Sequence, residues 1–408
     1  MKLGLLSTSL KHSYSAQIHQ KLSNNEYNYY EVEPKDLKDF LTNPHFDGLN
    51  VTIPYKQSVI PYLDEIDDIA KEINSVNTIV YHNNKLKGYN TDYLGFDYLI
   101  KHHNIIIKDK NITILGTGGS SQSVAYYCRK NQAKNINIIS RNKDNYLHYD
   151  QIHSGDIIVN TTPVGMYPNL NEQINLINTN YQYAIDLIYN PLNTSFLQFF
   201  DQKTIKINGL LMLVAQAYYS HQLFLKQKLN KQQIIDIYHQ LKDQLTNIVL
   251  IGMPTCGKST LGKLLSEKLN KTFKDTDQLI IDKINMSIAD YINKYEITNF
   301  RKLEKEVIFN LQKTTNSIIA TGGGSILDYD NIKNLSYNSF IIFIDRPLSL
   351  LKSDNDHPLS NNINKLNQLY EQRLPLYQQY SNCIIKNDQT IENTIEKIKE
   401  AYDQYLSY

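Results

Sequence analysis

Short apolar runs recur along this chain, each followed by a polar or glycine-rich tip and then by a helix-like stretch. Apolar runs without alternation are typical of parallel strands buried on both faces, and the stretches of helical period between them supply the crossover helices. The sequence therefore predicts an α/β fold with parallel sheets. The runs that carry this prediction are residues 3–6, 111–115, 136–139, 156–159, 184–188, 247–251 and 317–320.

The most specific motif follows the apolar run at residues 247–251. The chain reads NIVLIGMPTCGKST from residue 247, and a helical pattern continues from there. A strand, the spacing Gly-x-x-x-x-Gly-Lys-Ser and a helix together indicate a P-loop, which surrounds phosphates with backbone N–H groups; a chance glycine turn is the alternative. Lys258 would hold the β- and γ-phosphates of ATP, and Ser259 would hold Mg²⁺. The residues expected at the nucleotide are Gly252, Gly257, Lys258, Ser259 and Thr260.

A second glycine-rich turn, GTGGSS from residue 116, follows the strand predicted at residues 111–115. Rossmann-type turns of this kind place a pyrophosphate at a helix N-terminus. The next strand ends near Arg141 and Lys143, where an NAD-binding fold carries an acidic group. Two cations there favour the 2′-phosphate of NADP(H), unless Arg141 is a solvated surface residue. The residues expected at the pyrophosphate are Gly116, Gly118, Gly119 and Ser120.

Polar residues also follow the strands predicted in the first hundred residues. Lys56 lies beyond a strand that Pro54 ends, and Asp92 ends a later strand. A lysine and an aspartate that converge can pass a proton to and from an oxygen, although a surface ion pair is the commoner result of such spacing. Ser13 and Ser15 stand at a predicted helix start, where hydroxyls either cap the helix or bind a carboxylate.

Further polar motifs follow the P-loop helix. Asp275 and Asp277 alternate at the end of a short predicted strand, so both should point to the same side, near the phosphates. Asp275 would then hold Mg²⁺ while Asp277 contacts an acceptor hydroxyl; exposed turn carboxylates are the alternative. Arg301 and Arg373 offer planar forks for a carboxylate, and the glycines after residues 317–320 let a ligand approach the backbone.

Composition narrows the class of protein. The net charge of +1 provides no bulk basic field for nucleic acid or for a membrane surface. The three cysteines are scattered through the 408 residues, which fits a reducing cytosol better than a disulfide scaffold. The apolar run at the start is too short for a signal peptide, and no segment approaches the length of a membrane span. We therefore expect a soluble, cytoplasmic protein of two or three domains.

Seven motifs in the first part of the chain carry a family resemblance. HSYSAQIH, NVTIPYK, SVNTIV, GYNTDYLG, DIIVNTTPVGM, AIDLIYNP and NGLLMLVAQA stand in an order that resembles the shikimate dehydrogenases over about residues 3–240. The resemblance implies that Lys56 and Asp92 are the catalytic pair. It also implies cofactor contacts from Gly209 and Met212, which by pattern alone are core residues. Substrate contacts are implied for Ser13, Ser15, Thr52, Asn77, Tyr189 and Gln216. One departure is Ala16, where the family usually has proline; little loss is expected, because alanine suits a helix start.

The last part of the chain resembles the shikimate kinases over about residues 247–405, through the P-loop, NFRKLE, TGGG and RLPLY. The resemblance implies that Lys258 and Asp277 are catalytic and that Glu304 orients Arg301. Shikimate would be bound by Asp277, Arg301, Gly323, Gly324 and Arg373.

Two departures from the kinase pattern stand out. Glu296 and Ile297 replace a Gly-Glu pair, and His357 replaces the arginine of the lid motif. Histidine is mostly neutral near pH 7 and would stabilise a transferring phosphate less well than arginine. We therefore expect a lowered kinase turnover unless Lys352 or Lys365 substitutes.

The motifs together imply three domains: residues 1–100, completed by about 210–245, for the dehydrogenase substrate; 101–209, a Rossmann domain for NADP; and 246–408, a P-loop kinase with a parallel sheet. The expected function is NADPH-dependent reduction of 3-dehydroshikimate to shikimate, followed by phosphorylation of shikimate with ATP and Mg²⁺. One alternative is an oxidative quinate/shikimate dehydrogenase that uses NAD. The other is an active dehydrogenase fused to a weakly active or non-catalytic, ligand-sensing kinase-like domain. No nucleic-acid or membrane partner is expected.

Overall fold

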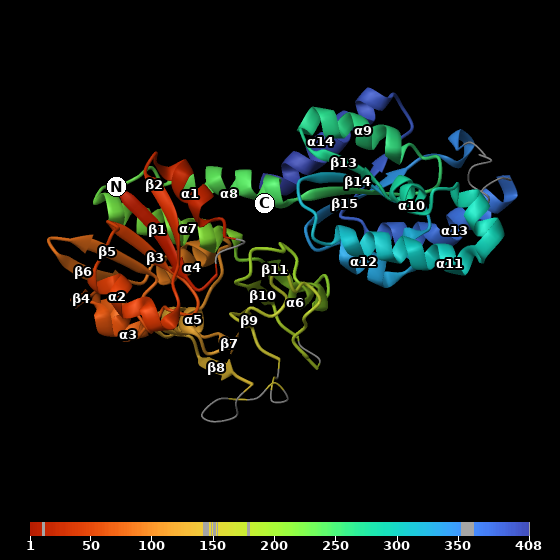
Figure 1. Ribbon diagram of the computed structural model, residues 1–408. Helices are drawn as coiled ribbons and strands as arrows, with labels where there is room; N and C mark the ends of the chain where they lie inside the picture. Colours follow the sequence, from red (N-terminus) through yellow and green to blue (C-terminus); the bar gives the residue numbers. More distant parts are fainter. Residues whose placement is uncertain are drawn as a thin grey trace. The chain divides into compact units, whose positions relative to one another are not determined.

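The computed structural model describes residues 1–9, 13–141, 147, 149, 152, 154–177, 180–351 and 363–407. The chain forms two compact units, Met1–Gln240 (unit 1) and Leu241–Tyr408 (unit 2), which are described separately (Figure 1). The boundary falls within helix α8 (Gln232–Leu245). Both units combine helices with parallel strands, so the predicted α/β fold class is confirmed. The finer division into three domains stays a prediction.

The first sheet of unit 1 has the strand order β2-β1-β3-β5-β6-β4. β1 is parallel to β2 and β3, while β5 is antiparallel to β3 and β6. Asn83 and Asn84 close the β5–β6 hairpin with φ of 50° and 55°, a left-handed backbone that asparagine tolerates better than most residues. The strands are β1 (Lys2–Ser7), β2 (Glu26–Glu31), β3 (Gly48–Val51), β4 (Glu65–Ile66), β5 (Thr78–His82) and β6 (Lys85–Tyr89). The helices of this part are α1 (Ser15–Leu22), α2 (Leu37–Thr42), α3 (Asp68–Ile73) and α4 (Asp92–His102).

The second sheet of unit 1 is wholly parallel, in the order β11-β10-β9-β7-β8. Its central strands are almost entirely apolar because both faces are covered, and β9 is buried along its whole length. The strand order reverses beside β7, and open parallel sheets bind ligands beyond the carboxyl ends of the strands at such a point. The strands are β7 (Asn111–Leu115), β8 (Asn135–Ile139), β9 (Ile157–Asn160), β10 (Tyr183–Asp186) and β11 (Ile205–Ile207). The helices are α5 (Gly119–Lys130) and α6 (Ser195–Phe199).

Helix α7 (Leu210–Leu225) follows the second sheet but packs against the elements of the first, on α4 and α1. Two glycines permit this path. A Cβ on Gly209 would overlap the carbonyl group of Leu187, and a Cβ on Gly95 of α4 would lie 2.8 Å from the carbonyl oxygen of Met212. The close crossing of α4 and α7 brings Gln216 beside the start of α4.

Unit 2 is built on one parallel sheet in the order β13-β14-β12-β15-β16 (Figure 1). Its central strand β12 is buried at every position, in a core shared with β14, β15 and the helices. The strands are β12 (Asn247–Ile251), β13 (Thr272–Asp275), β14 (Ser317–Ala320), β15 (Ser339–Asp345) and β16 (Cys383–Lys386). The helices are α9 (Lys258–Leu269), α10 (Thr276–Ile284), α11 (Ile288–Leu311), α12 (Tyr329–Leu335), α13 (Ile363–Tyr380) and α14 (Ile391–Ser407).

Short 3-10 segments complete the described elements: η1 (Pro34–Asp36), η2 (Ile60–Tyr62), η4 (Ser325–Leu327) and η5 (Leu348–Leu350). Across the described parts of both units, no helix combines the length and the apolar character needed to cross a membrane.

Helix α11 is interrupted at Glu296, which has φ 69° and ψ 156°. This backbone region is essentially restricted to glycine, and a residue with a side chain is strained there by roughly 1–3 kcal/mol. Glu296 is one of the two positions at which the sequence departs from the kinase pattern, where glycine is usual. The backbone at this position therefore has the conformation that favours glycine, although the residue is glutamate.

Candidate active sites

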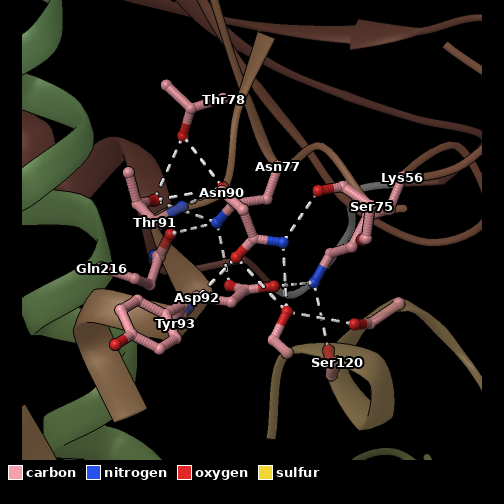
Figure 2. A network of polar contacts seen from close by, with 12 residues as sticks. Lys56, Ser75, Asn77, Thr78, Asn90, Thr91, Asp92, Tyr93, Ser120 and Gln216 are labelled. Atoms are coloured by element: carbon pink, nitrogen blue, oxygen red, sulfur yellow. Dashed lines mark hydrogen bonds and ion pairs between the residues drawn. The ribbon is translucent and has the colours of Figure 1, made fainter. Parts of the chain in front are cut away.

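Lys56 and Asp92 meet at the end of the first sheet (Figure 2). Lys56 lies in the turn after β3, and Asp92 is the first residue of α4, directly beyond β6. Lys56 Nζ is 2.6 Å from Asp92 Oδ2, and the two side chains are only 14% and 8% exposed. Surface ion pairs are exposed, salt-screened and poorly fixed, and this pair is not. The surface alternative raised by the spacing is therefore excluded.

Asn77 holds the other oxygen of this carboxylate. Its Nδ2 donates to Asp92 Oδ1 at 2.9 Å and lies 3.3 Å from Gln216 Oε1 of α7, while its Oδ1 accepts from the backbone N–H of Thr91 at 2.7 Å (Figure 2). Asn77 is 3% exposed. Because both oxygens of Asp92 are engaged, the carboxylate has one fixed orientation toward Lys56.

The two predicted serines form a small hydroxyl cluster at the start of α1. Ser13 Oγ donates to Ser15 Oγ at 3.1 Å and accepts from the Ser15 N–H at 3.2 Å. Between them, Tyr14 stacks edge-on with Tyr189, with ring centroids 6.0 Å apart, and burial raises the pKa of Tyr189 to about 12. Tyr189, which follows β10 of the second sheet, thus reaches the serine turn as a neutral phenol. Thr52 follows β3, and its N–H donates to Leu6 O.

The turn after β7 has the geometry of a phosphate-binding loop. Gly116 has φ +108°, and a Cβ on Gly118 would meet nothing within 4 Å, so the backbone is open to a ligand. Gly119 opens helix α5. A pyrophosphate fits this cradle because α5 presents free N–H groups and positive potential there. Ser120 instead points toward Lys56, with Oγ 3.1 Å from Nζ.

The remaining cofactor residues predicted for unit 1 lie at three places. Arg141 is exposed, two residues beyond the end of β8. Lys143 lies outside the described residues. Gly209 caps the start of α7, and Met212 is buried within that helix.

Sequence reasoning missed Asp186, at the end of β10. It is fully buried and accepts hydrogen bonds from Thr194 Oγ1 at 2.6 Å, from Asn160 Nδ2 at 3.0 Å and from the Ile188 N–H at 3.0 Å. Burial raises the pKa of this carboxyl to about 7. Its place three residues before Tyr189 indicates that it shapes the loop on which Tyr189 sits. The only available signal was a lone acidic residue inside an apolar run.

The backbone of the P-loop in unit 2 surrounds the side chain of Lys258. Gly252 and Gly257 have φ of +151° and +100°, and Thr255 has φ 60°, which gives the loop its tight curvature. Lys258, the first residue of α9, donates to Gly252 O at 3.0 Å and to Met253 O at 2.8 Å. The ammonium group therefore sits in the cradle where phosphates would bind. Ser259 and Thr260 follow it on the exposed first turn of α9.

The expected alternation of two aspartates along a strand is wrong. Asp275 does end β13, but its side chain caps α10 by accepting from the Asp277 N–H at 3.0 Å, and Asp277 lies in the first turn of that helix. The helix begins at Thr276, within the stretch expected to be strand, because Asp275 is a good N-cap. Both aspartates still line one cavity. Ser259 Oγ donates to Asp275 Oδ2 at 2.5 Å, so two oxygen atoms of the kind that Mg²⁺ prefers lie together.

This cavity, of ≈450 Å³, also collects the predicted arginines and glycines. Arg301 Nη1 is 2.6 Å from Glu304 Oε2, and Arg373 Nη1 donates to Gly323 O at 3.1 Å. Glu304 is 1% exposed, and burial raises the pKa of its carboxyl. A Cβ on Gly324 would overlap the guanidinium group of Arg301, so a side chain there would displace the arginine. The cavity is suited to a small anion beside the P-loop.

Two expectations for unit 2 fall beyond what the structure describes. His357 and Lys352 lie outside the described residues, as does the side chain of Lys365. Within the described residues, no group of three or more histidine, cysteine, aspartate or glutamate side chains is placed to hold a metal ion.

Comparison with known proteins gives a match for each unit. The family model described as shikimate dehydrogenase substrate binding domain matches residues 5–79, and the one described as shikimate kinase matches residues 254–403. A shikimate dehydrogenase (NADP(+)) from Clostridium beijerinckii is 37% identical over 259 residues, 58% of this chain and 96% of the relative. One from Methanosphaera stadtmanae is 36% identical over 256 residues, 54% of this chain and 90% of the relative. The crystal structure of shikimate dehydrogenase 1 from Peptoclostridium difficile matches with a TM-score of 0.55 and 35% identity, covering 59% of this chain and 97% of that one.

A dinucleotide-binding sheet beside a buried Lys–Asp pair, followed by a P-loop domain, defines a dehydrogenase joined to a phosphotransferase. The chain belongs to the shikimate dehydrogenase family through unit 1, and unit 2 contains a shikimate kinase domain. It is therefore a bifunctional enzyme of the shikimate pathway, which confirms the resemblance drawn from its motifs.

Proposed function

We propose that in unit 1 Lys56 is the proton donor for reduction of 3-dehydroshikimate to shikimate. NADPH, when bound, supplies the hydride that reaches the carbonyl carbon. The Lys56 ammonium gives a proton to the carbonyl oxygen as that oxygen becomes a hydroxyl, and the neutral amine regains its proton from solvent. Asp92 orients the lysine and balances its charge. The buried 2.6 Å contact between the two groups is the observation that carries this proposal.

The substrate would lie between the serine turn and the catalytic pair. Ser13 and Ser15 offer hydroxyl donors to its carboxylate, and the buried phenol of Tyr189 stands beside them. Asn77 and Gln216, which are already hydrogen-bonded to each other, face the ring hydroxyls together with Thr52. These contacts fix which carbonyl carbon faces the cofactor.

NADP(H) would bind along the turn after β7. Gly118 leaves the backbone open to the pyrophosphate, Gly116 supplies the positive φ of the turn, and Gly119 begins the helix that faces it. Arg141 pairs with the 2′-phosphate. Lys143 is assigned to the same phosphate, while Gly209 and Met212 border the cofactor at the start of α7. An NAD-binding fold has an acidic residue at this position to bind the ribose hydroxyl groups. The exposed cation found here suits the 2′-phosphate of NADP(H) instead.

In unit 2 the γ-phosphoryl group of ATP would pass to the 3-hydroxyl of shikimate. Lys258 contacts the β- and γ-phosphates, while Arg301 and Arg373 bind the carboxylate of shikimate against Gly323 and Gly324. Asp277 accepts the hydroxyl proton as the phosphoryl group arrives, and ADP leaves.

Magnesium fits the oxygen pair of Ser259 and Asp275. The two oxygens are 2.5 Å apart at the mouth of the P-loop, and Mg²⁺ needs few protein oxygens because it keeps several waters. When bound, the ion supplies charge that stabilises the transferring phosphoryl group.

The proposed partners are small molecules only, and the proposed location is the cytoplasm, where three scattered cysteines stay reduced. The alternative of a kinase-like domain that only senses its ligand is not favoured, because a shikimate kinase family model matches residues 254–403.

Two assays on the intact chain test the proposal. NADPH oxidation with 3-dehydroshikimate tests unit 1, with quinate and NAD as the competing pair. ADP release with shikimate, ATP and Mg²⁺ tests unit 2. Shikimate binding without ADP release would contradict the kinase proposal, and faster turnover of quinate with NAD would contradict the reductive one.

A further inference from the structure

The first turn of α5 touches the catalytic lysine directly. Ser120 is the second residue of this helix, and its Oγ lies 3.1 Å from Lys56 Nζ, although the two residues are 64 positions apart in sequence (Figure 2). By position in the motif, Ser120 belongs to the pyrophosphate turn. Its hydroxyl is instead directed at the group that handles the proton.

The contact determines how the ammonium group is turned. An ammonium has three N–H bonds, and Asp92 Oδ2 at 2.6 Å and Ser120 Oγ at 3.1 Å accept two of them. Rotation about the Cε–Nζ bond is then restricted, so the third N–H has one direction. That N–H is the one left for the substrate oxygen, and proton transfer depends on its alignment.

Helix α5 is fastened in this position by a second set of contacts. Ser123 Oγ lies 3.1 Å from Asn90 Nδ2, which also donates to Ser75 O at 2.8 Å. Ser123 is 0% and Asn90 5% exposed. A Cβ on Gly119 would lie 2.6 Å from Ser75 Oγ, so only glycine allows this close approach. The Ser120–Lys56 contact therefore lies in a packed joint between the two sheets of unit 1.

We propose that Ser120 is a positioning residue for Lys56 in the proposed reduction, and that it acts on the proton step more than on cofactor binding. The Ser120 hydroxyl accepts one N–H of Lys56 both before and after the transfer. After Lys56 has given its proton to the substrate oxygen, the nitrogen lone pair faces the new hydroxyl group of the substrate. The serine proton is not transferred, and solvent returns the lost proton to Lys56.

Three variants separate this role from packing. Ser120→Ala removes the hydroxyl, and Ser120→Thr restores it. Ser220→Ala is the control, since it removes a buried hydroxyl of unit 1 that donates to Ala217 O within α7 and takes no part in fastening α5. For Ser120→Ala we expect kcat to fall roughly tenfold, as for loss of one hydrogen bond to a charged group. The KM for NADPH should stay within about twofold. The solvent deuterium isotope effect should rise, because the proton step becomes slower relative to the others.

A readout in the free protein does not depend on turnover. The rate at which an amine-reactive reagent labels Lys56, followed by peptide mass spectrometry, should rise several-fold in Ser120→Ala, because the nitrogen has lost one of its two partners. Ser120→Thr should restore both the labelling rate and kcat. Ser220→Ala should lower thermal stability and leave the labelling rate and the solvent isotope effect as in the parent chain.

The inference rests on the proposed reduction, but the two can fail separately. A parent chain that does not oxidise NADPH with 3-dehydroshikimate contradicts the proposed function. Equal labelling of Lys56 in the parent and Ser120→Ala overturns the positioning role, whatever the activity. So does a Ser120→Ala variant that raises only the KM for NADPH, since the serine would then serve only the cofactor.

Discussion

The centre of unit 1 balances its charges internally, whereas the centre of unit 2 leaves two cations facing backbone carbonyl groups. Lys56 pairs with Asp92, whose second oxygen is held by Asn77. Lys258 and Arg373 are also buried, but they donate to carbonyl oxygens of Gly252, Met253 and Gly323.

This difference matches the charge of what each centre must handle. A compensated ammonium exchanges a proton with a neutral carbonyl or hydroxyl group without attracting anions. Cations that are hydrogen-bonded to neutral carbonyl groups keep a positive field, which attracts phosphates and a carboxylate. Loss of a charged residue from the centre of unit 1 should therefore lower kcat. Loss of a cation from the centre of unit 2 should mainly raise the KM for its ligands.

The largest expected effect is that of Lys56→Ala. Removal of a general acid typically costs about 10²–10⁴-fold in rate, so kcat for 3-dehydroshikimate reduction should fall by that factor with a small change in KM. Lys85→Ala is the matched control, because Lys85 pairs with Glu65 at the surface with a 60% exposed side chain. Steady-state NADPH oxidation measures both variants. A Lys56→Ala enzyme within tenfold of the parent would break the comparison.

Arg301→Lys should act mainly on binding. Arg301 pairs with Glu304, and in the proposed function its planar fork also binds the substrate carboxylate. Lysine cannot reproduce that fork, so the KM for shikimate should rise about 10–100-fold while kcat falls less. The ADP-release assay measures both constants, and the dehydrogenase activity of the same variant is the internal control. A fall in kcat with an unchanged KM would show that Arg301 acts on turnover, as the residues of unit 1 are expected to do, and would contradict the comparison.

Glu296→Gly should stabilise unit 2. Relief of a strained φ of 69° gains roughly 1–3 kcal/mol, and the extra chain entropy of glycine removes about 1 kcal/mol of that. The free energy of unfolding from urea titration should rise by the difference. The same change at Glu306, in a regular turn of α11, is the control and should destabilise by about 0.5–1 kcal/mol. If both variants lose stability, the backbone at Glu296 does not store the strain that its φ indicates.

The smallest effect near neutral pH concerns a buried histidine pair in unit 1. His19 Nδ1 and His221 Nδ1 are 2.9 Å apart, burial lowers both pKa values, and that of His221 falls to about 4. As pH falls below 6.5, the unfolded histidines take up protons that the folded pair does not. The free energy of unfolding should therefore drop between about pH 6.5 and 4.

His221→Gln should flatten this slope, since one of the two groups no longer titrates. His45→Gln is the control, because His45 is exposed and should leave the slope as it is. Thermal unfolding followed across the pH range measures all three proteins. An unchanged slope in His221→Gln would mean that other groups set the acid stability.

Several residues of both centres could be predicted from the motifs, because these motifs depend on residues that are close together in sequence. A P-loop needs a strand, a glycine turn and a helix that are contiguous in sequence, so Lys258 and Ser259 are placed by their neighbours alone. For Lys56 and Asp92 the spacing alone favoured a surface ion pair, and the order of the motifs, through the resemblance to the shikimate dehydrogenases, is what led us to expect that they meet. The roles of these residues stay predictions until the assays are done.

Other features depended on contacts between distant segments. The burial that excludes a surface ion pair at Lys56 comes from packing around it. Asp277 was expected on a strand, but Asp275 caps a helix that begins there. Ser120 looked like a phosphate ligand only, and it reaches Lys56 because α5 is fastened at Asn90 and Ser75.

The sequence by itself determined the α/β class, the two nucleotide turns and the family of each part, because strand periodicity and glycine turns are short-range properties of a chain. Only the tertiary structure decided that the Ser120 hydroxyl meets Lys56, that the Asp186 carboxyl is buried and that α11 bends at Glu296. Those outcomes depend on how closely separate elements can approach, and that distance is set by packing across the whole unit.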